Sequence, residues 1–309
     1  MIEVTQEFDI RYIDASSICK FNRCPAAYLF SRQLGLTLPE SSMIAPHFGT
    51  CIHSALPYCY EGVDNIDYAC EVFNKEWDSF CDKFGYVDGN DDKRNKIVAR
   101  QMLADFAKHR DPAYCPYEIV KLDIEAPTKD KISKNEIPFL IDIGASLAAA
   151  GRIDIPIRWR SDRSLWCDDY KTASEISARF FKNFMNAPQT ILYTLALSHI
   201  TGEKVQGMII EALRVSKNNR ETAMQFIFVK DHQIASFLRL AQDTADEITK
   251  CNKEKKWPKK CTGCSPYSMF GGAGRTCEYL DICDHPDWED GARIYRKNEP
   301  FHPFEIEVD

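Results

Sequence analysis

Apolar residues in the first third of the chain recur at helical spacing. They repeat every three or four positions, and short stretches rich in Gly, Asn, Asp or Pro separate the segments. This pattern is typical of helices joined by loops. The predicted helices are residues 16–33, opened by Ser16 or Ser17, then 48–60, 65–83 and 93–109. We therefore predict a helical N-terminal part that covers residues 1–115.

After residue 116 the apolar segments become shorter, and apolar and polar residues alternate in some of them. Turn residues separate these segments, so we predict β-strands. These strands are residues 117–126, 138–144, 150–158, 164–171, 205–214 and 223–230. Helical patterns return at 174–181, 186–200 and 231–251, the last with Ile234, Phe237, Leu238, Leu240, Ala241 and Ala245 on one side. The order predicts an α/β fold (an α+β mixed sheet with helices packed on it) whose core spans residues 116–251.

Composition places the chain among ordinary soluble globular proteins. It has 309 residues, of which 44% are hydrophobic and 28% charged, and we expect a single domain over residues 1–309. There is no long apolar run and no secretory signal at the start, so we expect a cytoplasmic protein and no membrane contact. The net charge of −7 is evidence against a broad surface for nucleic acid, although a local basic groove remains compatible with it.

The segment LWCDDYKTA carries candidate catalytic chemistry. Side chains alternate between the two faces of a strand, so Asp169 and Lys171 share one face with Cys167. Asp168 and Tyr170 point the other way. A carboxylate and an ammonium thus lie side by side, although an Asp-X-Lys pair on a solvated strand face would look the same.

A second acidic residue precedes this strand in GRIDIPIRW. Asp154 is predicted in mid-strand among apolar residues, where a carboxylate is costly unless it is paired or bound to a cation. Two carboxylates on adjacent strands suit Mg²⁺, which keeps waters and uses few protein ligands. Lys171 would then orient or help deprotonate a water and offset charge in the transition state. The alternatives are a salt bridge between Asp154 and Arg152, or an aspartate that terminates a turn.

The series GRIDI, DDYKT and QTILY resembles the motifs of the RecB-like PD-(D/E)XK nucleases. The resemblance implies a restriction-endonuclease-like core in which Asp154, Asp169 and Lys171 are catalytic and both aspartates bind metal. It also implies that Gln189 and Tyr193 line the site. Their four-residue spacing places these two side chains on one face of a helix.

Further site residues follow from the same resemblance. Gly49 and His53, in FGTCIHSAL, match a Gly-x-x-x-His pattern whose histidine joins the metal shell. An imidazole ligand would favour Mn²⁺ alongside Mg²⁺. Glu125 in LDIEAP is a candidate lining residue, and Asp142 in FLIDIG is a competing acidic candidate.

The 13 cysteines divide into two groups. Scattered ones, namely Cys59, Cys70, Cys81 and Cys115, are expected to be small buried residues. The others lie near the ends of the chain and resemble the layout of iron–sulfur nucleases, in which one early and three late cysteines join the chain ends. The resemblance implies that Cys24, Cys264, Cys277 and Cys283 hold a [4Fe–4S] cluster, with Cys261 as a rival to Cys264.

The last part, residues 252–309, is accordingly predicted to be a cysteine-rich cap that closes onto Cys24. Because Cys261 and Cys264 also show a zinc-like spacing, a Zn²⁺ site is one alternative, and cysteines that bind no metal are the other.

The resemblance implies a metal-dependent DNA nuclease, more an exonuclease than a site-specific endonuclease, which acts on single strands or ends. The chain has no helicase motif or Walker loop, so a helicase or recombination partner is expected for duplex unwinding. One alternative is a DNA-binding or scaffold subunit that cuts little, and another is an adaptation factor that works with partner proteins.

Overall fold

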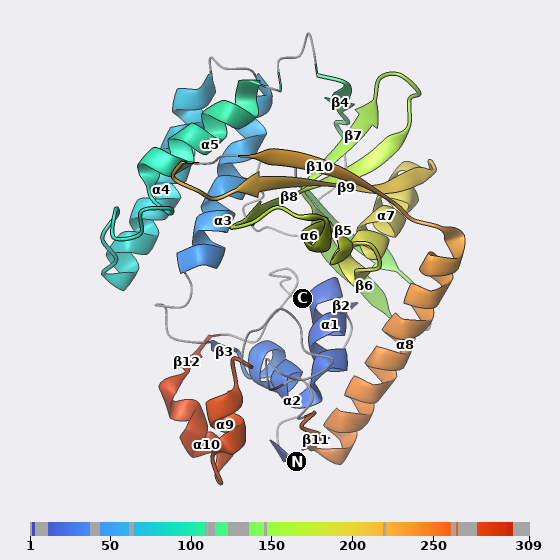
Figure 1. Cartoon of the computed structure of the whole chain (residues 1–309). Coiled ribbons are helices and arrows are strands. Elements are labelled where there is room, and N and C mark those ends of the chain that lie inside the picture. The colour runs from blue at the N-terminus through green and yellow to red at the C-terminus, as the bar shows by residue number, and fades with distance from the viewer. Residues whose placement is uncertain are drawn as a thin grey trace, which may run out of the picture. The chain divides into compact units, whose positions relative to one another are not determined.

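The structure is a computed structural model of the chain (Figure 1). It describes residues 2–3, 12–37, 44–61, 65–108, 110, 115–122, 136–144, 147–218, 221–260, 264 and 277–298. The chain forms two compact units. Unit 1 comprises residues 1–39, 140–151 and 234–309, and unit 2 comprises residues 40–139 and 152–233. The units are therefore not successive stretches of sequence, because unit 1 takes both ends of the chain.

The first predicted helix, residues 16–33, is broken at Cys24. The structure has α1 (Ala15–Arg23), α2 (Pro25–Tyr28) and a π-helical turn at Leu29–Gln33. Pro25 forces the break because its ring disfavours a helical conformation at the preceding residue, and Cys24 is extended, with φ −163° and ψ 112°. The N-cap is Asp14, not Ser16 or Ser17, because its carboxylate accepts a hydrogen bond from Ser17 N.

The other predicted helices of the N-terminal part are confirmed with shifted ends. They are α3 (Ile44–Ala55), continued by a 3₁₀ turn at Leu56–Glu61, α4 (Ile66–Phe84) and α5 (Lys96–Lys108). Helix α3 starts at residue 44, four residues before the start of the predicted helix 48–60. Gly85 ends α4 in a left-handed conformation, with φ 62°, as a C-terminal glycine commonly does.

A five-stranded mixed sheet forms the centre of unit 2. Its order is β10-β9-β8-β7-β4, with β8 and β9 parallel and the other neighbours antiparallel. The strands are β4 (Tyr117–Ile119), β7 (Ile155–Trp159), β8 (Leu165–Ala173), β9 (Val205–Arg214) and β10 (Thr222–Phe228). The predicted mixed α/β class is confirmed. The strand predicted at 117–126 is shorter, and residues 123–126 lie outside the described part.

The strand predicted at 150–158 is two strands that meet at Asp154. β6 (Ala148–Ile153) belongs to a three-stranded sheet of order β2-β6-β5, and β7 belongs to the five-stranded sheet. The other members are β2 (Tyr12–Ile13) and β5 (Ile137–Asp142). The prediction that Asp154 lies in mid-strand is therefore wrong. Asp154 lies at the bend where the chain leaves one sheet and joins another, so its main chain is released from strand pairing.

Helices cover both faces of strand β8. One face carries Trp166, Asp168 and Tyr170, and Tyr170 packs against Phe106 of α5 with 5.5 Å between ring centroids. We call the face with Trp166, Asp168 and Tyr170 the α5 face. Apolar residues of α3, α4 and α5 form one hydrophobic core with this face. The opposite face carries Cys167, whose Sγ lies 3.3 Å from the carbonyl oxygen of Tyr193 in α7 (Pro188–Thr201). We call it the α7 face.

Along the chain, helix α6 comes after strand β8, and helix α8 comes after strand β10 (Figure 1). α6 (Ala178–Lys182) is shorter than the predicted 174–181, and none of its residues is buried. α8 (Asp231–Glu254) buries residues at helical spacing, namely Phe237, Ala241, Thr244, Ala245, Ile248 and Asn252. Leu240, predicted on this buried side, is 38% exposed because it lies at the flank of that stripe.

Unit 1 joins the two ends of the chain by short pairings. β1 (Ile2–Glu3) pairs with β11 (Lys256–Trp257), and β3 (Leu36–Thr37) pairs with β12 (Arg296–Lys297). The remaining elements are α9 (Leu280–Asp284), α10 (Trp288–Gly291) and a 3₁₀ turn at Ala292–Ile294. Their core is aromatic and includes Phe21, Tyr28 and Trp257, with Cys24 buried beside them.

The described helices were also compared with the requirements of a membrane span. None of them is both long and apolar enough to cross a bilayer.

Candidate active site

Strand β8 places Asp169 and Lys171 together on its α7 face. The Asp169 side chain is 2% exposed, and its Oδ2 lies 2.5 Å from the Lys171 ammonium, which is 26% exposed. Alternation along the strand accounts for this pairing, as the sequence predicts. A buried carboxylate is thus held beside a partly accessible cation.

Asp154 joins this pair from the neighbouring strand. Ile155 pairs with Asp168, so the same register continued by one residue brings Asp154 opposite Asp169. The main-chain N–H of Tyr170 donates to Asp154 Oδ2 at 3.3 Å, which fixes the carboxylate against β8. Burial, and then repulsion from Asp169, raise the pKa of Asp154 to about 6. Two carboxylates therefore compete for the same small volume, as in a site built for a cation.

Lys171 remains charged in this setting. Burial lowers its pKa, but the negative charges of Asp169 and Asp154 outweigh burial and raise the pKa above its ordinary value. An ammonium with a raised pKa is a poor proton acceptor. It can still donate hydrogen bonds and stabilise negative charge, so these are the roles open to Lys171.

His53 reaches the same site from helix α3. Its Nε2 lies 2.6 Å from the carbonyl oxygen of Tyr170, and its Nδ1 lies 3.4 Å from Asp154 Oδ2. A carbonyl oxygen only accepts hydrogen bonds, so Nε2 carries the proton. In a neutral imidazole the Nδ1 lone pair then faces the carboxylate, and two electron donors point at one another across a gap that a cation would fill.

Gly49 accounts for the close approach of α3 to β8. A Cβ at this position would lie 2.8 Å from Thr172 Oγ1, closer than real Cβ contacts. His53 lies one helical turn further on. In the Gly-x-x-x-His pattern, the glycine thus lets α3 lie close to β8, and this close approach brings the His53 side chain to the site.

Helix α7 contributes Gln189, whose Nε2 donates to Asp169 Oδ1 at 2.9 Å. This bond orients the carboxylate while Oδ2 faces Lys171. Tyr193, one turn further along α7, packs edge-on against Phe139 with 5.6 Å between centroids, and its carbonyl oxygen lies near Cys167. Gln189 therefore contacts the acidic pair directly, whereas the described contacts of Tyr193 lie further along the same face.

Two other acidic candidates are not placed at this site. Glu125 lies outside the described residues. Asp142 is exposed at the end of β5, and its Oδ1 accepts a hydrogen bond from Gly144 N at 2.8 Å, which is a turn contact.

The described residues include no group of three or more His, Cys, Asp or Glu side chains already gathered around a metal position. The donor set at Asp154, Asp169 and His53 nevertheless fits a hard divalent cation. Mg²⁺ takes one or two carboxylates and completes its shell with water or substrate oxygen. Asp169 Oδ2 is buried and lies against the Lys171 ammonium, so a bound cation would share this carboxylate with Lys171.

The candidate cluster cysteines lie in unit 1 around residues 259 and 260. Lys260 N lies 3.5 Å from Cys24 Sγ, and Cys264 Sγ lies 3.7 Å from Lys260 O. Cys277 N donates to Cys264 O at 3.2 Å, and Lys259 Nζ donates to Cys283 O at 2.8 Å. None of the described cysteines forms a disulfide. These contacts bring cysteines from both chain ends to the segment around residues 259 and 260, without a gathered group of three thiols among the described residues, and Cys261 lies outside the described part.

The α5 face of β8 holds a buried polar network that the sequence motifs do not reveal. Asp168 and Glu211 are fully buried there. Tyr60 donates to Asp168 Oδ2 at 3.2 Å, and Tyr117 donates to Glu211 Oε1 at 2.9 Å. Arg110 forms an ion pair with Glu211. These partners are 94 to 108 residues apart in sequence, so no local signal could have found them.

Comparison with known proteins covers nearly the whole chain. A solved structure from Eubacterium rectale named "Putative exonuclease" is 14% identical, with 82% of this chain and 86% of that chain covered and a TM-score of 0.46. No curated protein matches the chain. Residues 13–284, which contain every described residue of the site, match the PD-(D/E)XK nuclease superfamily. With this match over most of its length, the chain belongs to the PD-(D/E)XK nuclease superfamily.

Proposed function

We propose that this protein is a divalent-metal-dependent DNA nuclease that degrades DNA from ends. The observation that carries the proposal is the buried group of two carboxylates, Asp154 and Asp169, beside the charged Lys171. Membership of a nuclease superfamily makes hydrolysis of a phosphodiester bond the reaction.

Asp154 and Asp169 would hold Mg²⁺ or Mn²⁺, with the Nδ1 of His53 as a further donor. When bound, the ion would supply positive charge to the phosphate and lower the pKa of a coordinated water. The imidazole favours Mn²⁺ as an alternative to Mg²⁺, because nitrogen ligands suit Mn²⁺ better than Mg²⁺.

The other residues position the reacting groups. Lys171 donates hydrogen bonds to the attacking water or to a phosphate oxygen and offsets the negative charge that develops in the transition state. Gln189 holds Asp169 in one orientation, and Tyr170 N holds Asp154.

We also propose that the four cysteines of unit 1 bind a [4Fe–4S] cluster that ties the chain ends together. Four thiolates suit this cluster. Zn²⁺ is the alternative, since it accepts four thiolates equally well. This role places the protein in a reducing compartment, the cytoplasm. We further propose that a helicase or recombination partner prepares its single-stranded substrate.

A cleavage assay tests the nuclease proposal. Protein purified without oxygen is incubated with end-labelled single- and double-stranded DNA, in Mg²⁺, Mn²⁺ or EDTA. We expect cutting that needs metal, starts at ends and is lost in Lys171→Ala. Lys75→Ala, an exposed lysine on α4, is the matched control and should cut normally. Absence of cutting by the folded wild-type protein in every metal would favour a DNA-binding subunit.

The cluster is tested by Cys283→Ala beside Cys251→Ala, a half-buried cysteine that packs on the same core. The first variant should lose bound iron, visible absorbance and thermal stability, and the second should keep all three. If Cys283→Ala retains the wild-type iron content, the cluster assignment is wrong. If the wild-type protein contains zinc and no iron, the alternative holds.

A further inference from the structure

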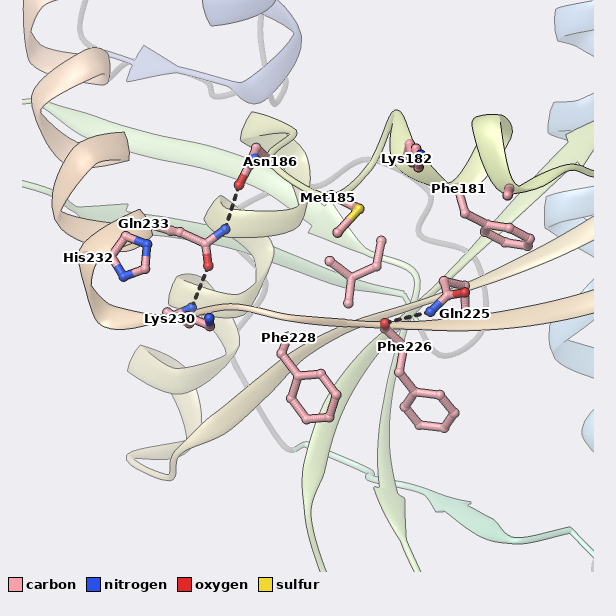
Figure 2. Close-up of a pocket in the computed structure, with 12 residues that line it drawn as sticks. Phe181, Lys182, Met185, Asn186, Gln225, Phe226, Phe228, Lys230, His232 and Gln233 are labelled. Carbon is pink, nitrogen blue, oxygen red and sulfur yellow. Dashed lines mark hydrogen bonds between the residues drawn. The ribbon is translucent and has the colours of Figure 1, made fainter.

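A pocket of about 500 Å³ lies beside the proposed active site in unit 2. Its walls come from α6 and the segment that follows it, from strand β10, and from the start of α8 (Figure 2). The volume falls within the range of about 300–1,000 Å³ that is usual for small-ligand sites. The proposed phosphodiester chemistry does not use any of its lining residues.

The charge of the pocket differs from that of the chain as a whole. Lys182, Lys230 and His232 line it, and no carboxylate does, although the protein carries a net charge of −7. Both lysines are exposed, and neither forms an ion pair with a described carboxylate. Two unneutralised ammonium groups at the mouth of a pocket on an acidic protein suit a phosphate-bearing ligand.

The interior of the pocket is apolar. Phe181 and Met185 point toward it from the α6 side in Figure 2, and Met185 is 53% exposed. Phe226 and Phe228 point away in the same view, and their rings pack against Trp166 on the α5 face. Helix α6, which buries none of its own residues, thus presents the ring of Phe181 to an open space, and the turn that follows it adds the thioether of Met185.

Side-chain amides supply directional polar groups. Gln233 Nε2 donates to Asn186 Oδ1 at 2.6 Å, and Gln233 Oε1 accepts from Lys230 N at 2.8 Å. This arrangement fixes Asn186 and leaves its NH₂ group without a partner among the described residues. A fixed amide beside an apolar wall can recognise the edge of a nucleobase.

The strand register relates the pocket to the catalytic residues. Gln225 of β10 pairs with Ile210 of β9, and Ile210 pairs with Asp169 of β8. Residues paired in this way point to the same face of the sheet. Neighbouring strands are about 4.8 Å apart, so the pocket wall lies roughly 10 Å across the sheet from Asp169, about three stacked nucleotide steps of 3.4 Å.

We propose that this pocket is a subsite for single-stranded DNA, in which a base a few nucleotides from the scissile phosphate packs on Phe181 and Met185. Lys182 and Lys230 contact the flanking phosphates, and Asn186 and Gln225 face the edge of the base. A single strand is favoured because its unstacked bases can enter a pocket and stack on aromatic side chains. The inference rests on the proposed function and adds to it the form of the substrate and its path.

The test uses the full-length protein in EDTA, where nothing is cut. Binding of fluorescent oligothymidylate is measured by anisotropy over a salt series. We expect Lys182→Gln/Lys230→Gln to bind at least tenfold more weakly, with a salt slope smaller by about 1.4, from ~0.7 per lost phosphate contact. Phe181→Ala should bind roughly fivefold or more weakly. Lys75→Gln, on the helical layer of the opposite face, is the control and should bind normally.

A second readout separates this subsite from the catalytic centre. Thymidine 5′-(p-nitrophenyl phosphate) is too short to reach the pocket, so the pocket variants should hydrolyse it at the wild-type rate while losing kcat/KM on oligonucleotides. Wild-type binding in the pocket variants overturns the inference, and the edge of β10 then suits a protein strand instead. An equal loss on blunt duplex DNA also overturns it. If the wild-type protein never cuts DNA, the proposed function fails, yet weakened binding in the variants still supports the subsite.

Discussion

Each of the two faces of strand β8 carries a buried aspartate, but the two aspartates differ in their partners and in their distance from solvent. On the α7 face Asp169 pairs with Lys171, which is 26% exposed and so within reach of a substrate. On the α5 face Asp168, the adjacent residue, is fully buried beneath helices, and its Oδ1 accepts no hydrogen bond from a described residue. Strand β8 therefore places Asp169 where a substrate can reach its partner Lys171, and it buries the adjacent Asp168 in the core.

The difference lies in the counter-charges and in access to water. Burial, and then the charge of Glu211, raise the pKa of Asp168 well above its ordinary value, which favours the protonated form of this side chain. Arg110 neutralises Glu211 and packs over Phe106 at 4.2 Å from the ring centroid. On the α5 face the charged groups are thus buried and neutralise one another. The α7 face keeps two acidic groups and one ammonium in an arrangement that suits a bound cation.

Paired substitutions give the largest expected contrast. Asp169→Asn should lower kcat/KM for DNA by about a thousandfold or more, equivalent to ~4 kcal/mol of transition-state stabilisation, because it removes a charged metal ligand. Asp168→Asn should stay within about threefold of wild type, because an amide keeps the shape of a buried carboxyl group whose charged form burial disfavours. Single-turnover cleavage with saturating Mg²⁺ measures both.

Circular dichroism and melting curves provide the control for this pair, and both variants should fold. If Asp168→Asn is as inactive as Asp169→Asn while folded, the division of labour between the faces is wrong.

The second prediction concerns stability on the α5 face. Arg110→Ala leaves the fully buried Glu211 without its cation, and breaking a buried pair in this way costs about 3–5 kcal/mol. The free energy of unfolding, measured by urea titration, should fall by that amount, while the activity per folded molecule stays unchanged.

Adding Glu211→Gln to Arg110→Ala removes the stranded charge and should recover part of the lost stability. A loss under 1 kcal/mol in Arg110→Ala alone would mean that water reaches Glu211, in which case the α5 face is not closed.

The contrast also explains what the sequence could and could not predict. Asp169 and Lys171 follow from strand alternation over three residues, a local property. The bend at Asp154 was missed because GRIDIPIR has the apolar pattern of one continuous strand, and nothing local marks a change of sheet. The break before Pro25 was predictable from the proline itself. The α5-face network was not, because Tyr60, Tyr117 and Glu211 meet only when the helices pack on the sheet.

Helix α3 contributes residues to both faces, and at Gly49 it approaches β8 too closely to leave room for a Cβ. Phe48 and Ile52 belong to the core of the α5 face, while His53 reaches Asp154. Gly49→Ala would place a Cβ 2.8 Å from Thr172 Oγ1, so α3 or Thr172 must move by a few tenths of an ångström. We expect a fall of roughly tenfold in kcat, similar to the loss of other second-layer supports of a metal site.

The rescue distinguishes positioning from general damage. Alanine is favoured over glycine inside a helix by roughly 0.5–1 kcal/mol, so Gly49→Ala destabilises only through the contact with Thr172. Thr172→Ala removes that Oγ1, and the double variant Gly49→Ala/Thr172→Ala should regain kcat and be at least as stable as Thr172→Ala alone. Loss of activity that persists in the double variant would show that the space beside Gly49 matters for another reason. Full activity in Gly49→Ala alone would show that α3 does not set the position of His53.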